Sequence, residues 1–179
     1  SNPGDTVLDP FCGCGTAIDA AQALGRKWIG IDITHLAIGV IKKRLLDRFG
    51  PDVVSTYKVI GEPADLEGAR QLAKEDTHQF EHWALGLVGA RASAKGKGAD
   101  KGIDGVLQMQ EAGVVKPVPI SVKSGNVTSG AIRDLRGVMH RDGSPIGILV
   151  TLKEPSKDMR TEAAAAGFYE VQNGLATVL

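Results

Sequence analysis

An aspartate and a Ser-x-Lys triplet in the second half of the chain form a residue set suited to phosphodiester hydrolysis. Asp104 precedes Gly105 after a glycine-rich stretch, and Ser121 and Lys123 lie in an apolar run. Strand alternation places residues 121 and 123 on one face, and a hairpin would bring Asp104 beside both. A carboxylate with neighbouring oxygens can hold Mg²⁺, and a lysine can act on water and stabilise charge on a phosphate.

Simpler interpretations of these residues remain open. An aspartate before a glycine is often a turn residue, and a lysine at the end of a strand is often a solvated charge. Spacing alone therefore does not separate a hydrolytic site at Asp104 and Lys123 from an ordinary turn and strand.

A glycine-containing turn near the N-terminus is a second candidate site. Residues 9–16 read DPFCGCGT, and Asp32 ends the next apolar run. Glycines let backbone amides approach a ligand at a helix N-terminus, and a carboxylate at the end of a strand can accept hydrogen bonds from ribose hydroxyls. The G-x-G-x-x-G pattern is not met, so a tight turn without a ligand is the alternative.

The elements around the first site read strand–helix–strand–helix. We expect strands at 6–8 and 28–31, a helix over 16–24 that stops at Gly25, and a second helix capped by Thr34. This order implies a parallel strand pair with a right-handed crossover. Residues 51–75 are acidic and contain two prolines, which indicates a surface linker with a short helix over 66–73.

Residues 76–179 are expected to alternate helices and strands. Asp76 or Thr77 would cap a helix, and segments 103–110 and 119–123 would pair as a hairpin. A helix over 129–140 precedes the most apolar run, 146–152, which we expect to be a central strand covered on both faces. A helix over 156–166 and a strand at 169–171 complete the pattern.

Composition sets broad limits. A chain of 179 residues with 42% apolar and 23% charged residues is one ordinary domain, or a domain plus a fragment. No apolar run approaches the roughly 18 residues of a membrane span, and the N-terminus does not read as a signal peptide. Cys12 and Cys14 are expected to be reduced thiols in a cytoplasmic protein. The net charge of zero does not by itself indicate nucleic-acid binding.

Residues 3–45 resemble a known family. The segment 9–16 followed by GRKWIGID at 25–32 is similar to motifs I and II of the DNA amino-methyltransferases that act on N4 of cytosine or N6 of adenine. The resemblance implies S-adenosylmethionine as the cofactor of the parent protein. It places Asp9, Phe11, Gly13 and Gly15 along the methionine side of the cofactor and Asp32 at its ribose.

The same segment lacks what methyl transfer needs. The chain contains no Asp/Asn-Pro-Pro-Tyr/Phe/Trp motif, and four elements cannot form the seven-stranded sheet of this family. We therefore expect the tail of a methyltransferase, with no methyl transfer and weak or no cofactor binding. The missing N-terminal methyltransferase part would be a partner, and a second copy of the chain could cover the open sheet edge as a homodimer.

Residues 76–170 resemble the restriction-endonuclease-like PD-(D/E)xK fold in its Mrr-like branch. The similar pieces are Phe80-Glu81, the segments 102–105, 121–123 and 147–152, and a helix with two arginines. The resemblance implies that Asp104 is a metal ligand, Lys123 the catalytic lysine and Glu81 a further acid and metal ligand. Double-stranded DNA would be contacted by Lys97, Lys101, Arg133 and Arg136.

Ser121 departs from this family pattern. The position usually holds Glu, Asp or, in this branch, Gln, whereas a serine hydroxyl adds no charge and is a poor Mg²⁺ ligand. We expect weaker metal binding unless Glu81, Asp100 or Glu111 compensates.

The sequence thus predicts an α/β chain in three parts. Residues 1–50 would be a truncated Rossmann-like βαβα piece, 51–75 a linker, and 76–179 a restriction-endonuclease-like α/β domain with a central mixed sheet. The expected function is Mg²⁺-dependent hydrolysis of DNA by a fragment of a restriction–modification protein. The alternative is a catalytically inactive module that binds DNA, positions the target or assembles a DNA methyltransferase.

Overall fold

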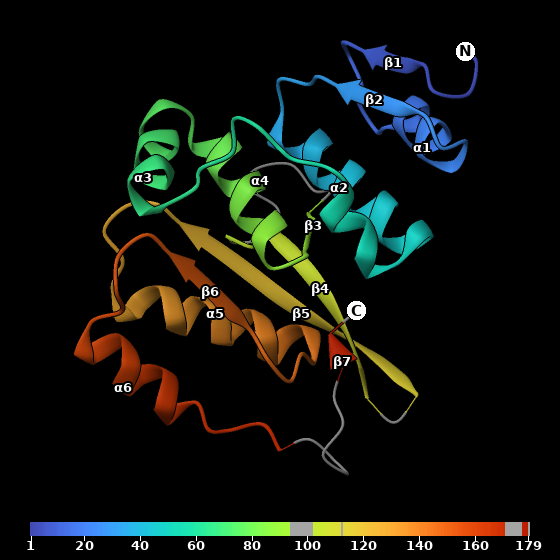
Figure 1. Cartoon of the computed structure of the whole chain (residues 1–179). Coiled ribbons are helices and arrows are strands. Elements are labelled where there is room, and N and C mark those ends of the chain that lie inside the picture. Colours follow the sequence, from blue (N-terminus) through green and yellow to red (C-terminus); the bar gives the residue numbers. More distant parts are fainter. Residues whose placement is uncertain (94–101, 112, 171–176, 179) are drawn as a thin grey trace. The chain divides into compact units, whose positions relative to one another are not determined.

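The computed structural model describes residues 1–93, 102–111 and 113–170, together with the backbone of 177–178. The chain divides into two compact units, Ser1–Ala64 and Asp65–Leu179 (Figure 1). Each unit has a hydrophobic core of its own. No helix of the described part is long and apolar enough to cross a membrane.

The first unit is the expected βαβα piece. Strands β1 (Thr6–Asp9) and β2 (Lys27–Gly30) pair in parallel, joined by α1 (Thr16–Ala23) and followed by α2 (His35–Phe49) and a 3-10 helix, η1 (Pro51–Thr56). Gly15, with φ of 76°, caps α1, and a Cβ there would lie 2.5 Å from Cγ1 of Ile41. Only glycine therefore fits between this turn and α2.

The second unit is built on a mixed five-stranded sheet. Its strand order is β3 (Arg91–Ala92), β4 (Gly105–Glu111), β5 (Val114–Lys123) and β6 (Ile148–Thr151), and β7 (Thr177–Val178) also pairs with β4. Strands β4 and β5 form the predicted antiparallel hairpin, and β6 runs parallel to β5. The predicted fold class, a βαβα piece followed by a mixed-sheet α/β unit, is confirmed.

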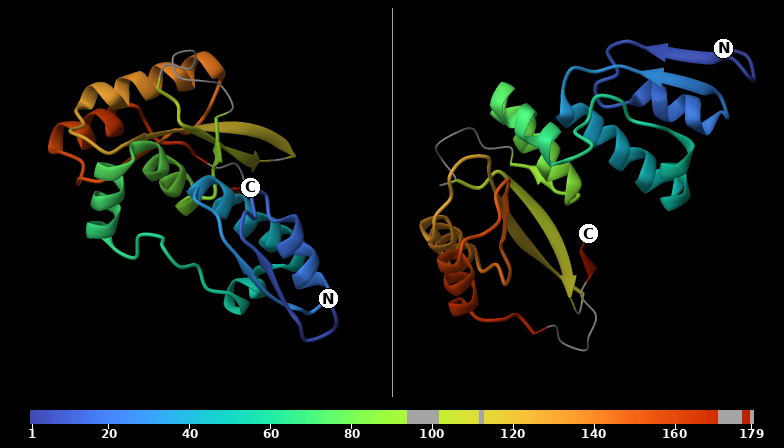
Figure 2. Two further views of the ribbon diagram at one scale, coloured as in Figure 1. Left: turned by 90° about the horizontal axis from the view of Figure 1, so that it is seen from above. Right: turned by 60° about the vertical axis from the view of Figure 1, so that its left-hand side comes forward.

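Helices cover both faces of this sheet. Helix α4 (Thr77–Leu87) lies on one face, with α3 (Leu66–Glu75) against it (Figure 2). Helix α5 (Ser129–Asp142) lies on the other face, with α6 (Lys157–Ala165) beside it. The core gathers Phe80, Ala84 and Leu85 of α4 against apolar side chains of β4 and β5.

The central strand is β5, and our expectation for segment 146–152 was wrong. Residues 118–122 of β5 are all buried, whereas every residue of β6 is only partly buried. Strand β6 stands at the end of the described strand order. An apolar run shows that a strand has an apolar surface to bury, but not how many strands will pair with it.

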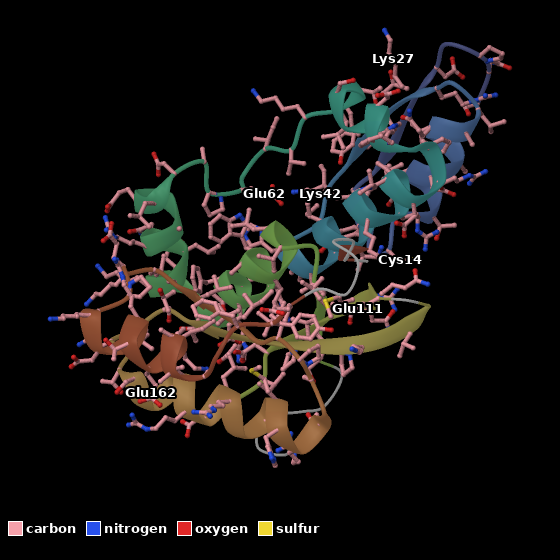
Figure 3. The ribbon with its side chains drawn as sticks, turned by 90° about the horizontal axis from the view of Figure 1, so that it is seen from below. Cys14, Lys27, Lys42, Glu62, Glu111 and Glu162 are labelled. Atoms are coloured by element: carbon pink, nitrogen blue, oxygen red, sulfur yellow. The ribbon has the colours of Figure 1, made fainter. Side chains whose placement is uncertain are left out.

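A strand was also expected at 169–171, but Tyr169 and Glu170 lie in no strand, and Val171 falls outside the described residues. Tyr169 instead joins a polar cluster at the turn end of the β4–β5 hairpin, where it contacts the buried Glu111. Figure 3 labels Glu111. Lys116 Nζ donates to Tyr169 Oη at 3.0 Å and to Glu111 Oε2 at 2.9 Å, and Tyr169 donates to Glu111. The hydrogen bonds that Lys116 donates to Tyr169 and to Glu111 raise the pKa of Lys116, and the bond to Tyr169 contributes most.

The segment expected to be a linker, 51–75, contributes to both cores. Val53 of η1 is buried in the first core, and Ala69 of α3 is buried in the second. The division between the units, at residues 64 and 65, falls inside this segment.

Candidate functional site

Asp104 lies where the β4–β5 hairpin opens. Its backbone N–H donates to Ile120 O at 2.9 Å, which extends the β4–β5 pairing by one bond. Its side chain then bends toward β5, and Oδ2 accepts the Val122 N–H at 2.6 Å. The carboxylate thereby pairs a backbone donor of β5 that would otherwise lack an acceptor at the end of the ladder.

Lys123 and Ser121 lie on either side of that contact. Lys123 Nζ is 3.5 Å from Asp104 Oδ2, and its side chain is 38% exposed against 19% for Asp104. Ser121 is buried, and its Oγ donates to Gly102 O at 2.8 Å and lies 3.5 Å from Asp104 Oδ2. The structure therefore brings Asp104, Ser121 and Lys123 together, as the strand alternation indicated.

Glu81 and Glu111 do not join this group by any described hydrogen bond or ion pair. The Glu81 carboxylate is 3.2 Å from Nδ1 of His78 on its own helix. Glu111 lies at the opposite end of β4, bonded to Lys116, so it cannot compensate for Ser121. Asp100 lies outside the described residues.

The oxygen atoms around Asp104 are ligands that suit a hard cation, but together they carry little negative charge. Oδ2 is engaged by Val122 and Lys123, whereas Oδ1 has no protein partner among the described residues and could serve a metal. The other oxygens present, Ser121 Oγ and Gly102 O, are neutral. Mg²⁺ takes such oxygen ligands and completes its shell with water. Within the described ranges, no three His, Cys, Asp or Glu side chains form a metal-binding group.

The residues predicted to bind DNA differ in their surroundings. Arg133 pairs with Glu162 of α6, labelled in Figure 3, at 2.8 Å, which offsets the charge of the arginine. Arg136 is exposed on α5. Lys97 and Lys101 lie outside the described residues.

In the first unit, Asp32 organises the glycine turn. Its Oδ2 accepts the Gly13 N–H at 2.9 Å, and its Oδ1 accepts the N–H and hydroxyl of Thr34 at 3.0 and 2.9 Å. The Thr34 bonds contribute most to lowering the pKa of Asp32, with a smaller contribution from Gly13. A hydrogen bond from the backbone of Ile33 also lowers this pKa, so donors of the turn and of the segment after β2 hold the carboxylate in place.

The other residues predicted to bind a cofactor lie along the same turn. Asp9 Oδ1 accepts the Phe11 N–H at 3.3 Å, and Phe11 as a whole residue is 88% exposed. Gly13 and Gly15 both have positive φ. The turn therefore presents backbone and an exposed ring, as a ligand-binding loop requires.

A cleft of about 570 Å³ opens beside Asp32. Its walls include Trp28, Tyr57 and a Lys42–Glu62 ion pair of 3.0 Å (Figure 3). Burial, and to a lesser degree the charge of Glu62, raises the pKa of Tyr57. Cys12, which lines the cleft, has a pKa raised by burial and then by Asp32 and Asp9, so it stays a neutral thiol.

Replacing Asp32 by asparagine is expected to lower the free energy of unfolding of the first unit by about 1–2 kcal/mol, since hydrogen bonds to an ionised acceptor are lost. Because the folded pKa lies below the ordinary 3.8, this stabilisation is present above pH 3.8 and is lost as the pH falls through the folded pKa. Urea unfolding at neutral and acid pH measures it. The control is Asp47→Asn, on an exposed carboxylate of α2 that pairs with Lys43. Equal losses in both variants at neutral pH would contradict the prediction.

Sequence reasoning missed the roles of three residues at this end of the sheet. Gly102 supplies the carbonyl that binds Ser121, and Asn126 and Lys153 meet close to the same edge of the sheet. For Gly102 the sequence gave a weak signal, a glycine before Ile-Asp. The Asn126–Lys153 contact joins distant segments, and the sequence holds no signal for it.

Comparison with known proteins agrees with both units. Residues 1–43 match the family described as "DNA methylase" (N6_N4_Mtase), and residues 72–173 match the family described as "Restriction endonuclease" (Mrr_cat). No solved structure gives a significant match.

Curated DNA methyltransferases match a short part of this chain. The Type II methyltransferase M.EcaI of Enterobacter cloacae is 57% identical over 44 residues, 25% of this chain and 10% of that protein. Type II methyltransferase M.BamHI of Bacillus amyloliquefaciens is 48% identical over 48 residues, covering 27% and 11%. The DNA adenine methyltransferase YhdJ of Escherichia coli (strain K12) is 49% identical over 57 residues, covering 32% and 17%.

These matches cover a small part of each methyltransferase, but the endonuclease match covers more than half of this chain. The endonuclease match includes Asp104, Ser121 and Lys123, which lie together at the open end of the β4–β5 hairpin. Over residues 72–173 the chain therefore belongs to the Mrr-type restriction endonuclease family, and residues 1–43 ahead of this domain are a fragment of an N6/N4 DNA methylase.

Proposed function

We propose that this chain hydrolyses phosphodiester bonds of double-stranded DNA with the help of Mg²⁺, at a site formed by Asp104, Ser121 and Lys123. The observation that carries the proposal is the 3.5 Å contact between Lys123 Nζ and Asp104 Oδ2 at an exposed end of the sheet. The match to the restriction endonuclease family over these residues supports it.

Each side chain has a distinct task in this proposal. Attack of water on phosphorus places negative charge on the phosphate oxygens, and the Lys123 ammonium can stabilise that charge and orient the water. Asp104 would hold the metal, and Ser121 fixes the Gly102 carbonyl beside Asp104. Glu81 would act as a further acid only after leaving His78, which lies 3.2 Å away. A bound Mg²⁺ would supply positive charge for the phosphate and the attacking water.

We also propose that the parent protein is a restriction–modification protein whose methyltransferase part binds S-adenosylmethionine. Asp9, Phe11, Gly13, Gly15 and Asp32 would contribute to that cofactor site. The functional limits would be 1–50 for the methyltransferase segment, 51–75 for the linker and 76–179 for the nuclease domain. A second copy of the chain would complete a homodimer at the open sheet edge.

Plasmid cleavage with Mg²⁺, then Mn²⁺, and with EDTA as the metal-free control, tests the proposed reaction. Nicking or cutting that requires the metal supports it. Intact plasmid under every condition, with a chain shown by circular dichroism to be folded, counts against it.

Ser121→Glu is expected to tighten Mg²⁺ binding by about tenfold, because it adds a second negative charge beside Asp104. Ser121→Gln is the matched control, since it has nearly the same shape and no charge. Calorimetric titration with Mg²⁺ and Mn²⁺ compares the two variants. Equal affinities would show that residue 121 does not face the metal.

A second candidate function rests on Ser121 itself. Its hydroxyl is already bound to Gly102 O, and the site has one carboxylate where the family pattern has more. This favours an inactive module that binds DNA or positions the target for a methyltransferase. DNA binding without metal uptake or cleavage would support this function over hydrolysis.

A further inference from the structure

A second lysine lies at the edge of the sheet that carries Lys123. Strands β5 and β6 are parallel, and Lys123 at the end of β5 is in register with Thr151 at the end of β6 (Figure 1). Lys153 follows Thr151 by two residues and is exposed. Because parallel strands end at the same edge, Lys153 and the Asp104–Lys123 pair share that edge.

Two contacts hold Lys153 in place. The Thr151 hydroxyl donates to Lys153 O at 2.6 Å, which fixes the backbone just after β6. Lys153 Nζ donates to Asn126 Oδ1 at 2.5 Å, and Asn126 lies three residues after Lys123 in the loop between β5 and α5. The ammonium is therefore tethered beside the loop that follows Lys123.

The tether leaves the charge of Lys153 uncompensated. An amide oxygen orients an ammonium but carries no negative charge, and no carboxylate of the described residues forms an ion pair with Lys153. Two arginines of the same unit differ in this respect, since Arg133 pairs with Glu162 and Arg160 lies 3.7 Å from Glu154. Lys153 thus offers a preoriented positive charge that an anion can reach.

We propose that Lys153, oriented by Asn126, binds a backbone phosphate of DNA and positions the strand against Asp104 and Lys123. This inference rests on the proposed function, because it takes DNA as the substrate of the same site. A lysine acts on a phosphate as a point charge that releases counterions on binding, so its contribution is independent of sequence and falls with salt. Lys153 is a positioning residue and takes no part in bond breaking.

The test is DNA binding by the full chain in EDTA, where metal-dependent cleavage is suppressed. Lys153→Gln is expected to weaken binding of a short duplex about fivefold and to reduce the salt slope by about 0.9, the value of one phosphate contact. Asn126→Asp places a carboxylate against the ammonium and is expected to weaken binding similarly. Lys153→Arg keeps the charge and should restore binding.

Lys74→Gln is the matched control, because Lys74 is exposed on α3 and the substitution removes the same charge. Its binding and salt slope should equal those of the unaltered chain. If Lys153→Gln also binds with unchanged affinity and slope, the inference is overturned while the nuclease proposal stands. If Lys153→Gln weakens binding but the unaltered chain never cuts plasmid, the nuclease proposal fails and Lys153 keeps its DNA-binding role. No binding by the unaltered chain overturns the inference.

Discussion

Asp104→Asn is expected to abolish plasmid cleavage, lowering the rate by more than about 100-fold, while the domain stays folded. Substituting residues that only support a metal ligand already costs 10- to 100-fold, so loss of the ligand charge should cost at least as much. Asparagine keeps a side-chain oxygen, so the Val122 N–H, 2.6 Å from Asp104 Oδ2, can retain its acceptor. Mg²⁺ titration should show loss of binding in the same variant.

Asp134→Asn is the control for this experiment, because Asp134 is exposed on α5 and the chemical change is identical. Both variants should keep the melting temperature of the unaltered chain to within a few degrees. Cleavage by Asp104→Asn at the full rate would remove Asp104 from the site and with it the proposed mechanism.

Lys123→Ala is expected to lower kcat by about 100- to 1000-fold, the usual cost of removing one group that stabilises charge in the transition state. Metal binding should respond differently. Lys123 Nζ lies 3.5 Å from Asp104 Oδ2, so its removal takes a competing cation away from the carboxylate. Mg²⁺ affinity should therefore hold or increase as cleavage falls.

A fall in kcat without a fall in Mg²⁺ affinity distinguishes Lys123 from a metal ligand. Cleavage kinetics at saturating Mg²⁺ and calorimetry on the same preparation give both values. Lys157→Ala, on an exposed lysine of α6, should leave both unchanged. A parallel fall of Mg²⁺ affinity and kcat in Lys123→Ala would show that the substitution disturbs the site as a whole.

The local parts of the site could be predicted because they follow from short-range rules. Alternation along a strand puts residues 121 and 123 on one face, and the hairpin geometry places Asp104 opposite them. The hairpin was predicted in the same way and is confirmed, and of the two candidate helix caps, Asp76 and Thr77, the structure shows Asp76. The catalytic and ligand roles of these residues stay predictions.

The remaining features depend on tertiary contacts that no sequence pattern encodes. Strand β5 is interior because it pairs with both β4 and β6, whereas the more apolar β6 ends the described order. Lys153 reaches Asn126 across 27 positions of sequence, and Tyr169 is held by Lys116 instead of extending a strand. In each case the position of a strand or side chain depends on a segment that is distant in the sequence.

The separate cores bear on how such a chain could arise. Every residue of one buried cluster lies before position 65, and every residue of the other lies after it, with Val53 and Ala69 closest to the division. A recombination event that joins two genes at the division, between residues 64 and 65, interrupts neither core. A change of sequence on one side of this division therefore leaves the packing of the other core unaltered.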